Sequence, residues 1–364
     1  MKLFDDIYRN RPVFVTGHTG FKGSWLCGFL NVCGAKITGY ALPPETTPSH
    51  FSLLKPNLIA DYRDDIRHAD KLTQAVQAAN PEIVFHLAAQ PLVRRSYRYP
   101  AGTFSTNILG TVHLLEACRQ TASVRAVVVV TTDKCYKNQE WDWGYRENDS
   151  LGGHDPYSAS KACAELVAES YRQSFSEMSG RKILYATCRA GNVIGGGDWS
   201  EDRLIPDLIR DASNDTVTKI RMPQATRPWQ HVLDPLAAYL LVGKRLLDGD
   251  VAGAEAWNFG PDTDGNLSVE QIAKKSRAVW DKIKFDCAEG TTLHETQLLM
   301  LDCTKAKRRL QWKPVWKIDE AVTKTIEWYK TYYETGRLLT QEQIADWAYR
   351  ACDADPELTC FEQG

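Results

Sequence analysis

The sequence predicts an α/β fold: a doubly wound parallel sheet, with a smaller mixed α/β lobe that binds the substrate. Three observations support this prediction. A short apolar strand at residues 13–15 runs into a glycine-rich turn and then into a helical pattern. Another strand, in the segment PEIVFHLAAQP (residues 81–91), runs into small residues. A third, at residues 126–130, is an unbroken apolar run, which is typical of a strand buried on both faces of a parallel sheet.

Length and composition limit the possible functions. The chain has 364 residues, which fits two domains or one large domain with an added lobe. Its net charge of -2 gives no sign of a nucleic-acid or membrane partner, and its apolar runs are too short to span a bilayer. The N-terminal residues lack the apolar core of a signal peptide, so a cytoplasmic protein is expected. The 10 cysteines form no C-x-x-C pair and have no metal-ligand spacing, so we expect reduced core residues and no metal.

The glycine-rich turn has the spacing T-G-x-x-G-x-x-G. Gly17 permits a tight turn, Gly20 lets the backbone approach a pyrophosphate, and Gly23 lets the helix pack closely on the strand. The free N–H groups at the start of the following helix favour the anion. Strand, turn and helix together predict a dinucleotide site, although a turn before an ordinary helix would look similar.

The second strand, at residues 35–42, lacks the acidic residue that usually binds the ribose of NAD. Gly39, Tyr40 and Ala41 occupy that place, and no arginine follows to bind the 2′-phosphate of NADP. Lys22 in the glycine loop is a candidate partner for such a phosphate. On balance the sequence favours NAD.

The third strand ends in Thr131, Thr132, Asp133 and Lys134, and ligands of doubly wound sheets bind at the carboxyl ends of strands. Downstream, a helix begins after the sequence Asp-Pro and carries Tyr157 and Lys161 four residues apart, on one face. A lysine ammonium and a nicotinamide cation would lower the tyrosine pKa from its usual value of about 10. Tyr157 is then a candidate base for a hydroxyl that Thr132 holds, whereas a surface Tyr–Lys pair is the alternative.

These segments together resemble the sugar-nucleotide dehydratases and epimerases of the extended short-chain dehydrogenase/reductase superfamily. The resemblance spans about residues 10–317 and rests on six segments: TGHTGFKGSWL, FHLAAQPLVRRSY, TTDKCYKN, PYSASKACAE, RAGNVIGGGDW and RPWQHVLD. It implies a Rossmann NAD-binding domain at 1–187, to which 228–260 return, and a sugar-nucleotide lobe at 188–227 and 261–364. It also implies a homodimer or a dimer of dimers, packed through the helices that begin near Asn107 and Tyr157. The most particular segments, GFKGSWL, YKNQEWDWGYREND and GNVIGGGDW, imply CDP-glucose as the substrate.

The resemblance also implies roles for individual residues. Asp65 and Ile66 would hold the adenine, Ala88 and Ala89 would leave room for the cofactor, and Asn107 would support the site. For Asp65, an ordinary acid at a helix N-terminus is the alternative. The implied cofactor contacts are Thr16, Gly17, Thr19, Gly20, Phe21, Lys22, Gly23, Asp65, Ile66, Leu87, Ala88, Ala89, Gln90, Asn107, Thr131, Tyr157 and Lys161. The implied substrate contacts are Asn192, Arg203, Arg227 and Asn258.

Two features of the substrate side stay open. Each arginine could form a surface salt bridge instead of binding a diphosphate. The aromatic side chains of Trp141, Trp143 and Tyr145 could stack on a base, line a lid or pack in the core.

The resemblance implies a 4,6-dehydratase that oxidises C4 of a hexose, removes the C5 proton with the C6 hydroxyl, and returns hydride to C6. Asp133 would be the acid on the C6 hydroxyl and must then be protonated. Related dehydratases have a glutamate base where this chain has Lys134. Lys134 could act as the base when neutral, or could stay charged and stabilise the C5 enolate while another base acts. A lysine that points to solvent is the third interpretation.

Three other functions compete with this one. A 4-epimerase would share Thr132, Tyr157 and Lys161 but would not need the Asp133–Lys134 pair. A dehydratase could act on another nucleotide hexose. A dinucleotide-sensing regulator could share the fold without any chemistry.

Overall fold

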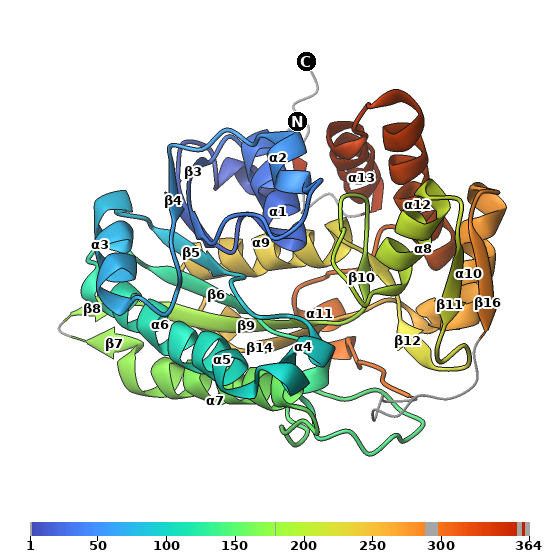
Figure 1. Ribbon diagram of the computed structural model, residues 1–364. Coiled ribbons are helices and arrows are strands. Elements are labelled where there is room, and N and C mark those ends of the chain that lie inside the picture. The colour runs from blue at the N-terminus through green and yellow to red at the C-terminus, as the bar shows by residue number, and fades with distance from the viewer. Residues whose placement is uncertain (1, 179, 288–297, 355–358, 361–364) are drawn as a thin grey trace.

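The computed structural model describes residues 2–178, 180–287, 298–354 and 359–360. Its centre is a seven-stranded parallel sheet in the order β14-β9-β6-β5-β2-β3-β4 (Figure 1). The strands are β2 (Pro12–Thr16), β3 (Lys36–Ala41), β4 (Ala60–Arg63), β5 (Ile83–His86), β6 (Ala126–Val130), β9 (Leu184–Ala190) and β14 (Ala256–Phe259). All five residues of β6 are buried, as its unbroken apolar run predicts. The predicted doubly wound α/β fold is confirmed.

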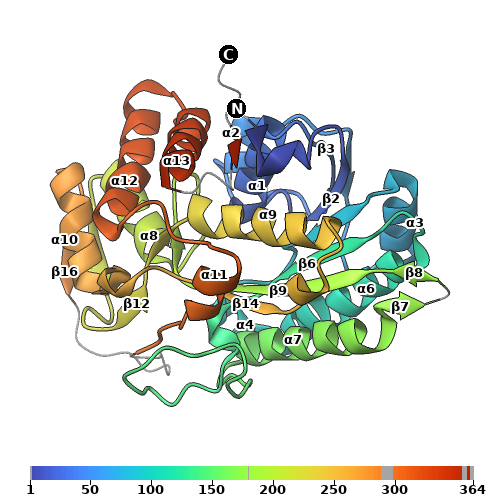
Figure 2. The ribbon, with the colours of Figure 1, turned by 180° about the vertical axis from the view of Figure 1, so that it is seen from behind.

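Helices cover both faces of the sheet (Figures 1 and 2). One face is covered by α1 (Phe21–Val32) and α9 (Leu233–Leu247), and the other by α3 (Ala69–Ala79), α6 (Gly110–Gln120) and α7 (Pro156–Phe175). Helix α7 begins where the sequence predicts, because the Asp155 carboxylate accepts the Ser158 N–H at 2.9 Å and Pro156 takes the first helical position. This start places Tyr157 and Lys161 at the carboxyl end of β6.

A second lobe lies beside the sheet. It contains α8 (Leu204–Ser213), α10 (Val269–Val279) and two small strand pairs, the parallel β11 (Val217–Ile220) with β16 (Lys284–Cys287) and the antiparallel β12 (Thr226–Pro228) with β15 (Asn266–Ser268). The remaining short elements are β1 (Lys2–Leu3), α2 (His50–Leu54), α4 (Val93–Arg98), α5 (Pro100–Phe104), β7 (Glu177–Met178), β8 (Arg181–Lys182), β10 (Val193–Ile194), β13 (Gln230–His231), α11 (Thr304–Arg309) and β17 (Thr359–Cys360).

The C-terminal segment contains two helices, α12 (Ile318–Thr335) and α13 (Thr340–Ala354). They join the hydrophobic core that contains α1 and α9, so this core continues from the sheet into the C-terminal helices. The division of the chain into the two predicted domains stays a prediction. Among the described helices, none combines the length and the apolar character needed to cross a lipid bilayer.

A run of three glycines, Gly195–Gly197, explains part of the GNVIGGGDW segment. A Cβ atom on Gly196 would lie 2.0 Å from Cγ of Trp328 on α12, and one on Gly197 would lie 2.6 Å from Cγ of His50 on α2. Gly197 also has a φ of +85°, which favours glycine. The glycines therefore let α12 and α2 pack directly on this backbone.

We expect the Gly196→Ala variant to lose about 3 kcal/mol of stability, because an added methyl group in a closely packed core forces side chains and backbone apart. Urea unfolding measures the loss. Gly102→Ala is the matched control, since nothing lies within 4 Å of a Cβ at that position. Equal stability of the two variants would contradict the packing role of Gly196.

A buried carboxyl group joins α9 to the C-terminal segment. Oδ1 of Asp234 accepts hydrogen bonds from Nε1 of Trp347 and from the Val315 N–H, both at 2.8 Å. Burial raises the pKa of Asp234 from 3.8 to about 7, against the opposing effect of these hydrogen bonds. The folded protein therefore binds a proton here that the unfolded chain loses near pH 4.

The stabilisation that Asp234 contributes is fully present below pH 4. It is lost as the pH rises toward 7, because in this range the Asp234 carboxyl group ionises in the unfolded chain but stays protonated in the folded protein. In the Asp234→Asn variant, which keeps an acceptor oxygen, we expect the fall in melting temperature between pH 5 and 7 to be smaller than in the wild type. Parallel pH profiles of the two proteins would contradict this assignment.

Candidate active site

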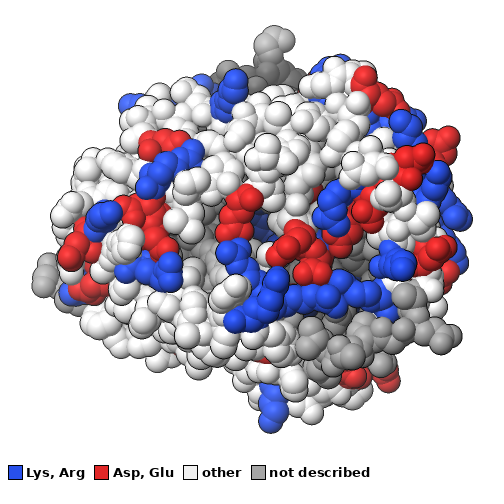
Figure 3. Space-filling view, viewed as in Figure 1, with Lys and Arg blue, Asp and Glu red and all other residues white. Residues whose placement is uncertain are grey.

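A cavity of about 1450 Å³ lies between the carboxyl ends of the sheet strands and the second lobe. Charged side chains gather across this face of the molecule (Figure 3). Several of them pair across the rim, with Arg95 3.1 Å from Glu45, Arg98 3.3 Å from Glu201, and Arg94 3.6 Å from Asp202. The cavity is long enough to be lined by residues from the glycine loop at one end and from α8 and β11 at the other.

The glycine loop forms a cradle at the cavity wall. Gly17 has a φ of +72°, and a Cβ there would lie 2.6 Å from the backbone nitrogen of Ala88. A Cβ on Gly23 would lie 2.1 Å from the Gly17 carbonyl oxygen. Gly20 precedes the first residue of α1, so the N–H groups of that helix open beside it. These contacts fit a dinucleotide whose pyrophosphate lies against the loop.

Most predicted cofactor contacts line the cavity, but two do not. The Thr16 hydroxyl bonds Nδ1 of His86 at 2.8 Å and accepts the Ala88 N–H at 3.2 Å. Asn107 accepts the Gln90 N–H at 2.8 Å and donates to Oγ of Ser160 at 2.8 Å. Both side chains are buried and hold the loop after β5, so they support the site instead of contacting the cofactor.

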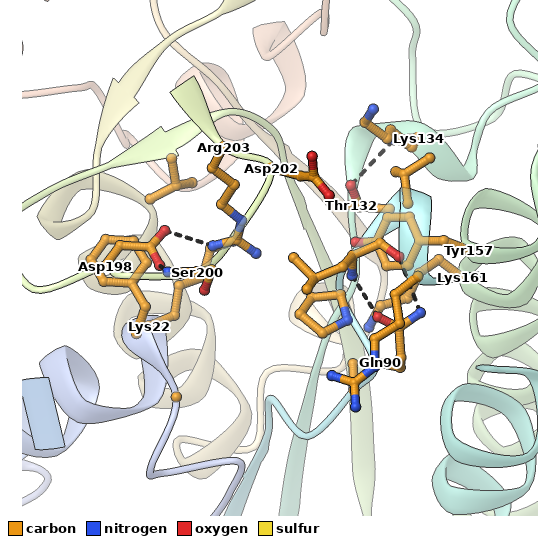
Figure 4. A pocket seen from close by; sticks show the side chains of 18 of the residues that line it. Lys22, Gln90, Thr132, Lys134, Tyr157, Lys161, Asp198, Ser200, Asp202 and Arg203 are labelled. Carbon is orange, nitrogen blue, oxygen red and sulfur yellow. Dashed lines mark hydrogen bonds and ion pairs between the residues drawn. The ribbon is translucent and has the colours of Figure 1, made fainter. Parts of the chain in front are cut away.

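The predicted contact of Lys22 with a 2′-phosphate is not supported. Its ammonium group is close enough to Arg203, Lys161 and Asp133 to interact with their charges, which places it at the catalytic end of the cavity, away from the end of β3. Burial, with Arg203 and Lys161, lowers the pKa of Lys22 to about 8. Figure 4 shows it on the same side of the cavity as Asp198 and Arg203.

Asp65 and Ile66 both line the cavity, and their contact with the adenine stays a prediction. Arg67 binds the Asp65 carboxylate through two hydrogen bonds. Its Nε donates to Oδ1 at 2.9 Å, and its NH2 donates to Oδ2 at 2.6 Å. The Arg67 hydrogen bond lowers the pKa of Asp65. The carboxylate is therefore ionised and oriented by Arg67.

The five predicted catalytic residues line one end of the cavity, the catalytic end, and Figure 4 labels four of them: Thr132, Lys134, Tyr157 and Lys161. Thr132, Asp133 and Lys134 follow β6, and Tyr157 and Lys161 come from α7. The Thr132 hydroxyl donates to Oδ1 of Asp133 at 2.9 Å, and Nζ of Lys161 donates to the Val130 carbonyl at 3.0 Å. Oδ2 of Asp133 is buried and has no hydrogen-bond partner among the described residues. This arrangement presents a hydroxyl, a carboxyl, two amines and a phenol to one cavity.

Burial controls the acid–base properties of α7. It raises the pKa of Tyr157 to about 12, against the opposing effect of the hydrogen bond with Thr132. Desolvation outweighs the neighbouring hydrogen bond here. The predicted lowering depends on a nicotinamide cation as well as on Lys161, so it stays a prediction for the protein with its cofactor bound. Burial also lowers the pKa of Lys161 to about 8, and the charge of Glu165 opposes that change.

Two arginines and an asparagine that the sequence predicts as substrate contacts line the cavity, and the contacts themselves stay a prediction: Asn192, Arg203 and Arg227. Arg203 donates to Oδ2 of Asp198 at 2.7 Å. Although burial opposes it, the Asp198 charge raises the pKa of Arg203, which stays cationic. These side chains can meet a diphosphate that extends from the catalytic end.

The structure does not support the predicted contact of Asn258 with the substrate. Its Nδ2 donates to the Tyr145 and Asp302 carbonyls at 2.8 and 3.2 Å, and its Oδ1 accepts from the Tyr136 hydroxyl at 2.7 Å. The residue is fully buried and is absent from the cavity lining. It ties β14 to the loop after β6 and is not placed to contact a substrate.

The aromatic segment divides between core and surface. The Tyr145 ring is buried and stacks on the rings of Tyr136 and Trp141, with centroid-to-centroid distances of 5.1 and 5.0 Å. Trp143 is exposed. Core packing is therefore the role of Tyr145.

The sequence analysis missed a buried ion pair between Glu165 and Arg189, in which Oε2 of Glu165 lies 2.7 Å from NH2 of Arg189. A charge inside the apolar strand 184–190 and an acid one turn after Lys161 were the available signals.

Fold and site define a member of the extended short-chain dehydrogenase/reductase superfamily, with a dinucleotide cradle and a Thr–Tyr–Lys set at the end of β6. A model of the GDP-mannose 4,6-dehydratase family matches residues 14–325, and the chain belongs to that family.

The chain is 46% identical over 349 residues to the CDP-glucose 4,6-dehydratase of Salmonella typhimurium, covering 94% of this chain and 97% of that protein. It is 30% identical to the low-salt glycan biosynthesis protein Agl12 of Haloferax volcanii, covering 87% and 98%. Among solved structures, MoeE5 in complex with UDP-glucose and NAD has a TM-score of 0.74 and 25% identity, covering 87% and 98%.

Proposed function

We propose that this protein is an NAD-dependent sugar-nucleotide 4,6-dehydratase that converts CDP-glucose to CDP-4-keto-6-deoxyglucose, a precursor for deoxysugar synthesis. The observation that carries the proposal is the Asp133–Lys134 pair directly after Thr132, facing the same cavity as Tyr157 and Lys161. An epimerase has no use for an additional acid and amine beside the threonine. The Salmonella relative supports CDP-glucose as the substrate.

The residues of the first part of the cavity fit NAD. The glycine cradle would hold the pyrophosphate, and Asp65 and Ile66 would lie at the adenine end. When bound, NAD supplies a hydride acceptor for C4 and later the hydride for C6. The last residues of β3 offer no cation for a 2′-phosphate, which favours NAD over NADP.

The residues of the catalytic end then carry out the proton transfers of the reaction. Thr132 orients the C4 hydroxyl, and Tyr157 takes its proton once the Lys161 ammonium and the bound cofactor stabilise the phenolate. Asp133, protonated, donates to the departing C6 hydroxyl. Lys134 removes the C5 proton, made acidic by the C4 ketone, and returns a proton to C5 when the stored hydride reaches C6. The net change is the loss of one water.

The far end of the cavity is the proposed place of the cytosine. Leu204, Thr218 and Ile220 line it, and the Thr218 hydroxyl is buried without a hydrogen-bond partner among the described residues. A sugar at Tyr157 and a diphosphate at Arg203 leave this end for the base. An unpartnered buried hydroxyl suits a polar edge of a ligand.

For Thr218→Val, which removes only the hydroxyl, we expect the KM for CDP-glucose to rise about fivefold with kcat nearly unchanged, the effect of one neutral hydrogen bond. Steady-state kinetics measure the change. Thr216→Val is the control, because that side chain is exposed on the same segment. A fall in kcat at constant KM would place Thr218 elsewhere in the reaction.

A homodimer or a dimer of dimers is part of this proposal. Phe104, Leu109 and Leu166 expose apolar side chains on α5, on the turn before α6 and on α7. Exposed apolar groups on neighbouring helices suit a two-fold interface. The ordinary composition and charge of the chain agree with a cytoplasmic location.

One experiment tests the function. The protein is incubated with NAD and, separately, with CDP-, dTDP-, GDP- and UDP-glucose, and the ultraviolet absorbance of a 4-keto sugar in alkali is recorded. We expect strong absorbance with CDP-glucose and much less with the others. Galactose-configured product without this absorbance would support a 4-epimerase, and tight NAD binding without turnover would support a regulator.

A further inference from the structure

Helix α7 carries a buried carboxylate that the reaction does not use directly. Glu165 lies one helical turn after Lys161 and two turns after Tyr157, so the three share a face. Oε1 of Glu165 accepts a hydrogen bond from the Thr131 hydroxyl. Oε2 accepts from the Thr187 hydroxyl at 2.7 Å and from NH2 of Arg189 at 2.7 Å. The carboxylate therefore joins α7 to the ends of β6 and β9.

Arg189 extends this connection to the far side of the catalytic loop. Its NH1 donates to the Tyr136 hydroxyl at 2.7 Å and to the Glu147 carbonyl at 2.9 Å. The guanidinium carbon also lies 5.0 Å from the centre of the Tyr136 ring. Because Thr131 and Tyr136 flank Thr132–Cys135, the ion pair holds the segment that presents the acid and the amine from both sides.

The charge of the same carboxylate opposes the effect of burial on the Lys161 ammonium, which lies one helical turn before Glu165. The other titratable groups around Lys161 are Tyr157 on its own helix, Cys135 after β6, His86 on β5 and Lys22 on α1. Burial raises the pKa of Cys135 and lowers that of His86, so both are neutral near pH 7. Among these described neighbours, Glu165 is the group with a negative charge.

We propose that Glu165 is a positioning residue for the dehydratase reaction: with Arg189 it fixes the Thr132–Lys134 loop against α7, and its charge, one helical turn from Lys161, acts on that ammonium group beside Tyr157. The inference rests on the proposed function for its role in turnover. The geometry of the buried cluster stands without it.

The test compares two variants that carry Glu165→Gln with a matched control and with Glu165→Asp. Glu165→Gln removes the charge but keeps the shape, and the double variant Glu165→Gln/Arg189→Gln also avoids leaving a buried cation unpaired. Thr187→Val removes one hydrogen bond to Glu165 without changing any charge. The protonation of Lys161 is followed in the NAD-saturated protein by the pH dependence of its acetylation, read by mass spectrometry, and kcat is measured from pH 6 to 9.

In both variants that carry Glu165→Gln we expect the midpoint of Lys161 deprotonation, and the alkaline limb of kcat, to move at least one pH unit lower. At pH 7.5 the activity should fall about tenfold. Thr187→Val should keep both midpoints. Glu165→Asp, which keeps the charge on a shorter side chain, should keep the limb while lowering kcat, because it loosens the tie to Thr131.

Unchanged Lys161 midpoints in Glu165→Gln and in the double variant would overturn the proposal and leave Glu165 a structural residue. Failure of the proposed function looks different. In that case no nucleotide hexose turns over in the wild type, while the acetylation profile still reports whether Glu165 sets the protonation of Lys161.

Discussion

Asp133→Asn should stop the reaction after C4 oxidation, with kcat lowered by about 10²–10⁴-fold. The amide keeps the acceptor oxygen that bonds the Thr132 hydroxyl, so the loop should stay in place. An amide cannot donate the proton that the departing C6 hydroxyl needs. Mixing the variant with NAD and CDP-glucose should therefore give a lasting absorbance at 340 nm and no 4-keto-6-deoxy product.

The packing around Asp133 makes this variant informative. A Cβ on Gly191 would lie 1.9 Å from Oδ2 of Asp133, so the site accepts a side chain of that shape and little more. Glu140→Gln, which neutralises another carboxylate of the cavity wall, is the control and should keep wild-type turnover. Product formation by Asp133→Asn within tenfold of the wild type would assign the acid to another group.

Lys134→Met should abolish proton exchange at C5, by at least about 100-fold. The measurement incubates the variant with the 4-keto product in deuterated water and follows deuterium at C5 by mass spectrometry. Thr132, Tyr157 and Lys161 are unchanged, so C4 oxidation should persist. Lys137→Met, three residues along the same wall of the cavity, is the control and should exchange normally.

Lys134→Arg separates the two roles that an amine can have here. A guanidinium stays charged and cannot act as a base near neutral pH. If Lys134 is the base, exchange is lost in this variant as well. If Lys134 stabilises the enolate as a cation, the arginine variant keeps much of the exchange. Undiminished exchange in Lys134→Met would exclude Lys134 as the proton carrier.

Local sequence patterns predicted several elements of the fold and the position of the site. The unbroken apolar run of β6 predicted a buried strand, and the glycine spacing predicted the cradle beside α1, since both depend on backbone conformation and on neighbours within a few residues. Asp155 and Pro156 predicted the start of α7 for the same reason. Because parallel strands end at one edge of the sheet, these elements also predicted that Thr132 and Tyr157 would meet.

Only the tertiary structure determined which partners the polar side chains of the predicted site have. Thr16 and Asn258 have residue types suited to ligand binding, but neighbours distant in the sequence occupy their hydrogen-bonding groups. Lys22 lies close enough to Arg203 and Asp133 to interact with their charges, and both residues are far from it in the sequence.

The same holds for charge. Desolvation, not the spacing of Tyr157 and Lys161, sets the direction of the tyrosine pKa in the protein itself. Glu165 meets Arg189 only because β9 lies beside β6 in the sheet. Sequence periodicity reports which face of an element is buried. What each buried polar group meets depends on segments brought together by the fold, and that decided the chemistry of the site.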